Sequence, residues 1–76
     1  MCRLDESEAL WHYNQLLSMF RTMKTGIDAG FVQQGNKAKI GDWYEIVCTL
    51  QMVLGLERVK YLKFQLLKYY IELPDE

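Results

Sequence analysis

The stretch DWYEIVCTLQMVLGLERVKYLKFQLLKYYIE, residues 42–72, decides the fold, because its apolar residues recur at the spacing of an α-helix. A helix turns by about 100° per residue, so side chains three and four positions apart share a face. This spacing predicts one helix from Asp42, with a capping-box-like Glu45 three residues on, and another from about Glu57 to Glu72. Gly55 lies between them and is either a turn that separates two helices or a tolerated glycine within one long helix. Pro74 ends the regular structure. The main apolar faces comprise Trp43, Ile46, Val47, Leu50, Val53 and Leu54 in the first helix and Val59, Leu62, Leu66, Tyr69, Tyr70 and Leu73 in the second.

Each of these two helices carries a second apolar stripe on the side away from its main face. A surface helix of a monomer shows one stripe, and three helices cannot cover two opposite faces on two of their own members. The glycine-rich segment and the long lysine stems offer partial cover. Contiguous exposed apolar patches, however, usually mark interfaces. The two stripes therefore predict an association surface, most simply that of a homodimer. Its residues are Tyr44, Cys48, Met52, Phe64, Leu67 and Ile71.

A third helix is predicted upstream, from Asp5 to about Thr25. The Asp5 side chain is placed to cap the first amides, Glu8 follows three residues later, and Gly26 is the expected C-terminal breaker. The helix is amphipathic, with Trp11 on its polar side. Its apolar face comprises Ala9, Leu10, Tyr13, Leu16, Leu17, Phe20, Met23 and Ile27.

Residues 28–41 contain three of the five glycines and join the first helix to the second. Phe31-Val-Gln-Gln and Lys37-Ala-Lys-Ile around Gly35-Asn36 fit a short β-hairpin. An isolated hairpin is only marginally stable, so a loop is favoured. The expected architecture is a single all-α domain over residues 1–76, with three helices and a glycine-rich loop.

Composition limits the function classes. Half of the 76 residues are apolar and a quarter are charged, and nine basic against ten acidic residues leave a net charge of −1. This balance disfavours a general polyanion binder. The acidic start lacks the apolar stretch of a signal peptide. The most apolar stretch, 46–56, is shorter than the roughly 18 residues of a membrane span. Cys2 and Cys48 allow at most one disulfide, so we expect a soluble, cytoplasmic protein without a membrane segment.

Motifs for catalysis, cofactors or metals are not recognised in the sequence. The single histidine, His12, has only Glu8 one turn away, whereas a zinc site needs about four ligands. Cys48 lies among apolar residues and is typical of a packed side chain rather than a nucleophile paired with His12. The glycines match neither a phosphate loop nor a dinucleotide fingerprint. We therefore expect a protein that is not an enzyme and holds no cofactor or metal.

An alternative is a dimeric helix-turn-helix regulator with Gly55 in the turn. A recognition helix presents polar side chains to base edges, whereas this one carries Tyr61, Phe64, Leu67 and Ile71 there. Nucleic acid is therefore the less favoured partner. The candidate basic contacts are Arg58, Lys60, Lys63 and Lys68.

These observations favour a binding protein that acts on another macromolecule. Tyrosine and tryptophan are enriched at binding hot spots, and Trp11 is the candidate hot spot outside the stripes. Such chains are often inhibitors or regulators, including those made by phages and mobile elements. The sequence leaves open the identity of the protein partner, its source, and the choice between activation and inhibition.

Overall fold

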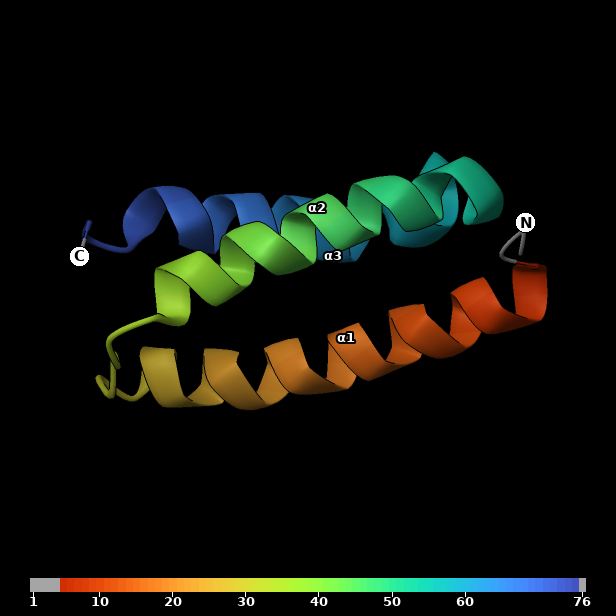
Figure 1. The fold of residues 1–76 in the computed structure, drawn as a ribbon. Helices are drawn as coiled ribbons and strands as arrows, with labels where there is room; N and C mark the ends of the chain where they lie inside the picture. Colours follow the sequence, from red (N-terminus) through yellow and green to blue (C-terminus); the bar gives the residue numbers. More distant parts are fainter. Residues whose placement is uncertain (1–4, 76) are drawn as a thin grey trace.

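The three segments with a helical spacing of apolar residues form three α-helices in the computed structural model, which describes residues 5–75 (Figure 1). The helices are α1 (Glu6–Asp28), α2 (Asn36–Leu54) and α3 (Leu56–Glu72). No strand occurs within residues 5–75, so the prediction of a small all-α domain with three helices is confirmed and the optional hairpin does not form. In Figure 1, α2 and α3 lie side by side and antiparallel, and α1 packs along them.

The start of α1 is as predicted, but its end lies further along the chain. An Asp5 side-chain oxygen accepts a hydrogen bond from the Glu8 N–H at 2.8 Å. The helix continues through Gly26 to Asp28, because the residue that adopts the left-handed conformation is Gly30, at φ +94°. The Gly30 N–H donates to Ile27 O at 2.9 Å and the Phe31 N–H donates to Gly26 O at 2.8 Å. This pair of bonds is a Schellman motif, in which a left-handed glycine just beyond the helix ends it.

Helix α2 begins at Asn36, which corrects the predicted start at Asp42. Gly35, at φ +92°, turns the chain into the helix without a side-chain cap. The Lys37-Ala-Lys segment after it consists of good helix formers, and it brings Ile40 into the core. Residues 36–41 are therefore helix, and the loop between α1 and α2 is limited to residues 29–35.

Gly55 resolves the question of one helix or two. Its φ of +86° and ψ of 155° place it outside helical geometry, in a region that favours glycine. It ends α2 and precedes α3, so the two helices form a hairpin with a one-residue turn.

The core contains residues from all three helices and confirms most of the predicted apolar faces. Four residues assigned to those faces, Leu10, Ile46, Val53 and Tyr70, are exposed because each lies at the margin of its face. Three helices cover only the centre of each face, so its margins remain in solvent. The buried apolar residues are Ala9, Leu16, Phe20, Ile40, Val47, Leu50, Leu54, Val59, Leu62, Leu66, Tyr69 and Leu73.

The packing of α1 against α3 relies on a few specific contacts. The Tyr69 hydroxyl donates to Asp28 Oδ1 at 2.6 Å, and the Tyr69 ring meets Phe20 edge-on at 5.6 Å between centroids. Burial, then the hydrogen bond to Asp28, raises the pKa of Tyr69. The hydrogen bonds from Tyr69 and then from Lys24 lower the pKa of Asp28. The contacts with Tyr69 therefore fix the end of α1 on α3.

Candidate functional site

The predicted second stripes lie on the side of the α2–α3 hairpin away from the core, and none of their six residues is fully buried. Three of their residues are largely exposed, with Met52 at 87%, Ile71 at 70% and Phe64 at 53%. Leu67 is 39% exposed. Tyr44 and Cys48 are half-buried, and Tyr44 packs against the core. We call these six residues together with Tyr70 the outer face.

A small cavity connects the two helices within the outer face. It has a volume of about 220 Å³ and lies between α2 and α3. Gly41 allows this close approach, since a Cβ atom built on it would lie 3.1 Å from Tyr70 Cε1. Sequence reasoning missed the role of Gly41, because only the three-dimensional fold places Tyr70 against it. The cavity is lined by Gly41, Tyr44, Glu45, Leu67 and Tyr70.

Lys37 holds one end of the outer face in place. Its ammonium lies 4.9 Å from the centroid of the Tyr70 ring, 3.1 Å from Leu73 O and 2.8 Å from Asp75 Oδ1. The hydrogen bond and charge of Lys37 lower the pKa of Asp75. These contacts fasten the start of α2 to the end of α3 and orient the Tyr70 ring.

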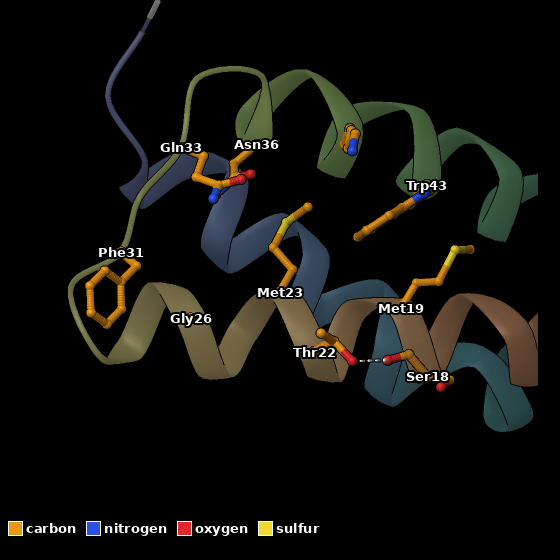
Figure 2. Close-up of a pocket in the computed structure, with 10 residues that line it drawn as sticks. Ser18, Met19, Thr22, Met23, Gly26, Phe31, Gln33, Asn36 and Trp43 are labelled. Atoms are coloured by element: carbon orange, nitrogen blue, oxygen red, sulfur yellow. Dashed lines mark hydrogen bonds between the residues drawn. The ribbon is translucent and has the colours of Figure 1, made fainter.

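A second candidate surface, which sequence reasoning missed, is a groove between α1 and α2 (Figure 2). Its volume is about 500 Å³. Figure 2 shows Met19 and Met23 of α1 facing Trp43 of α2, with Phe31 at the loop end. The groove exists because α1 and α2 are longer than predicted and meet at residues assigned to the loop. Its lining comprises Ser18, Met19, Thr22, Met23, Gly26, Phe31, Gln33, Asn36, Lys39 and Trp43.

Asn36 is the one polar residue that is buried within residues 5–75, with 8% of its surface exposed. It lies at the loop end of the groove beside Gln33 (Figure 2) and also lines an adjoining hollow of about 250 Å³. Its backbone N–H donates to Gln33 O at 3.2 Å.

The four basic residues considered for nucleic-acid contact each interact within the chain. Arg58 pairs with Glu6 at 3.3 Å, and Lys60 pairs with Glu57 at 3.4 Å. Lys63 donates to Gln51 Oε1 at 2.8 Å, and Lys68 lies 5.8 Å from the Tyr69 ring centroid. Helices α2 and α3 are antiparallel, whereas a helix-turn-helix crosses at roughly 90–120°.

The structure shows the surroundings of the residues considered for catalysis and metal binding. His12 is exposed and meets the Trp11 ring edge-on at 5.1 Å, and Trp11 itself is exposed. Cys48 is a free thiol on α2, and Cys2 lies outside the described residues. Between residues 5 and 75, no three histidine, cysteine or acidic side chains come together as metal ligands. None of the helices in that range has the length and apolar character needed to cross a membrane.

Comparison of the chain with protein-family models, curated proteins and solved structures found no significant match.

Proposed function

We propose that the protein is a non-enzymatic binding protein that self-associates through the outer face and, as a homodimer, inhibits another macromolecule. The observation that carries the proposal is the outer face itself. It combines Met52, Phe64, Leu67, Tyr70 and Ile71, all exposed, on one side of a hairpin whose other side supplies the core. Large apolar side chains grouped in this way are typical of interfaces.

The size of the outer face supports a second copy of the chain as its occupant. With roughly 200 Å² for each large side chain when fully exposed, the exposed fractions of the same five residues correspond to roughly 600 Å². A standard interface buries about 800 Å² on each partner. The outer face and its polar margin therefore suffice for a modest dimer. Two copies would pair hairpin against hairpin, so that each covers the other's apolar side chains.

The proposed action on another macromolecule relies on surfaces that such a dimer leaves free. Trp11 and Tyr61, which are 60% and 59% exposed, lie outside the outer face. Both are residue types that concentrate binding energy at interfaces. No observation favours nucleic acid as that macromolecule, because the basic side chains of α3 interact within the chain.

Sedimentation equilibrium of the parent and two leucine variants tests self-association. Leu67→Glu places a charge in the outer face, and Leu10→Glu places it on α1 at a matched exposure, 42% against 39%. We expect the parent and Leu10→Glu to have the mass of two chains at roughly micromolar concentration, and Leu67→Glu to have the mass of one. Equal masses for the two variants would contradict the proposal.

Affinity capture with the parent and Trp11→Ala tests the second half of the proposal. We expect Trp11→Ala to stay dimeric and to lose a macromolecule that the parent retains, because truncating a hot-spot aromatic costs roughly 2 kcal/mol or more. If the same macromolecule is retained by Trp11→Ala, Trp11 is not part of the binding surface.

A further inference from the structure

We infer that two copies of the chain pair antiparallel, with Met52 of each copy in the cavity between α2 and α3 of the other. This inference rests on the proposed function, because it assigns the contacts within the dimer that the outer face forms. It places the two-fold axis in the interface, running across the helices at the level of Cys48. The two Cys48 side chains then lie on either side of that axis.

The cavity in the outer face is sized for one side chain. Its volume is about 220 Å³, below the roughly 300–1,000 Å³ of small-molecule sites. Its walls are mostly apolar, and Glu45 contributes one carboxylate. The core of a stable interface is packed as densely as a protein interior. A second copy on the outer face therefore needs to fill this hollow with a side chain of its own.

Met52 is the side chain best placed to fill it. Among the large apolar side chains of residues 5–75, Met52 is the most exposed. Methionine is flexible and adapts to irregular gaps. Met52 lies eight residues after Tyr44 on α2, so about 12 Å along the helix separates it from the cavity of its own chain. Only a second copy can bring Met52 and a cavity together.

The spacing along α2 matches a two-fold axis at Cys48. Each contact of a symmetric pair occurs twice, so the axis lies midway between Met52 and the cavity. Cys48 is four residues before Met52 and four residues after Tyr44, which lines the cavity. Phe64 lies nine residues after Gly55 on the antiparallel α3, close to the level of Cys48, which is seven residues before it. Rotation about this axis therefore brings the two Phe64 rings near each other.

Ile71 is the alternative to Met52, since it is also largely exposed. It follows Tyr70 directly and lies at the cavity's own end of the hairpin. An axis that placed Ile71 in the other copy's cavity would lie at this end and would overlap only part of the two hairpins. Met52 would then remain in solvent. An axis at Cys48 covers the outer face along its length, as the area of a standard interface requires.

Charge substitutions at Met52 test its contact with Glu45 of the other copy. Met52→Glu places a second carboxylate at the cavity, whereas Met52→Lys places an ammonium there. Sedimentation equilibrium should show a dimer dissociation constant at least tenfold higher for Met52→Glu than for Met52→Lys. Adding Glu45→Lys to Met52→Glu should restore at least tenfold of the lost affinity. Met19→Glu, on α1 and outside the outer face, is the control and should dimerise like the parent.

Oxidative cross-linking tests the position of the axis. Facing helices pack about 8–10 Å apart, which brings Cα atoms beside the axis within the roughly 4–7 Å that a disulfide spans. In a Cys2→Ser background, we expect copper phenanthroline to oxidise the two Cys48 thiols to a disulfide in most of the dimer. The control carries Gln15→Cys on α1 in place of both native cysteines. Its thiol is exposed, and we expect it to stay unlinked.

A dimer that shows the charge restoration and the Cys48 cross-link would support the arrangement. A monomeric parent would overturn both this inference and the proposed self-association. A dimer that Leu67→Glu disrupts, but that neither cross-links through Cys48 nor regains affinity on the charge exchange, would overturn the antiparallel arrangement alone. Cross-linking of Gln15→Cys to the same extent as Cys48 would also overturn it.

Discussion

The two sides of α2 are packed differently. Toward α3, a glycine brings the helices so close that a Cβ at position 41 would lie 3.1 Å from the Tyr70 ring. Toward α1, methionines and a loop leave a groove of about 500 Å³. The first contact follows a one-residue turn at Gly55, and the second follows the longer loop of residues 29–35. The α2–α3 hairpin is therefore the more closely packed part of the fold, and α1 completes the core while leaving a groove against α2.

The largest loss of stability should come from a substitution on the inner side of the hairpin, which faces the core. Leu66 is fully buried and its neighbour Leu67 lies on the outer face. Burying an unpaired carboxylate costs several kcal/mol, as much as a chain of this size has in total, roughly 3–5 kcal/mol. We expect Leu66→Glu to be unfolded and Leu67→Glu to be folded by circular dichroism. Unfolding of both would show that the outer face belongs to the core.

The close α2–α3 contact should not tolerate a larger side chain at position 41. Gly41→Leu forces a side chain into the Tyr70 ring, and overpacking of this kind costs roughly 1–3 kcal/mol. Urea denaturation measures the loss. A variant as stable as the parent would show that Tyr70 moves aside freely, and the contrast between the two sides of α2 would disappear.

The attachment of α1 to α3 should depend on Tyr69. Tyr69→Phe removes the hydrogen bond to Asp28 and should lower the free energy of unfolding by roughly 1–2 kcal/mol. The pKa of Asp28 is lowered in the folded protein, first by Tyr69 and then by Lys24. Its contribution is therefore present above the unfolded pKa of about 3.9 and lost as pH falls through the folded value. Urea denaturation between about pH 7 and pH 2.5 should show a smaller loss of stability in Tyr69→Phe than in the parent.

The smallest change in stability is expected at Gly26, on the α1 side of the groove between α1 and α2. Gly26 is helical, and a Cβ there would meet no atom closer than Phe31 O at 3.9 Å. Gly26→Ala should therefore stabilise the protein by about 0.5–1 kcal/mol through helix propensity. A measured loss of stability would mean that the groove is tighter at this point than its volume indicates.

Periodicity predicted the three helices and most of the core, because apolar residues at positions such as Leu62 and Leu66 follow one face of a helix. It misplaced the helix ends around residues 26–41. Gly26 and Gly30 are equally plausible breakers in sequence, and only backbone conformation distinguishes them. The outer face was visible as a second stripe. The groove was not, since the loop predicted at residues 28–41 contains Asn36 and Lys39, and only the tertiary fold places them around the same groove as Met19 and Met23.

An isotope-filtered NOE experiment on an equimolar mixture of ¹³C-labelled and unlabelled chains tests the proposed dimer most directly. It detects only contacts between protons of different copies. The proposal predicts intermolecular NOEs from the Phe64 ring and from the Leu67 and Ile71 methyl groups to outer-face residues of the second copy. A dimer whose intermolecular NOEs arise from α1, or a sample without any such NOEs, would contradict it.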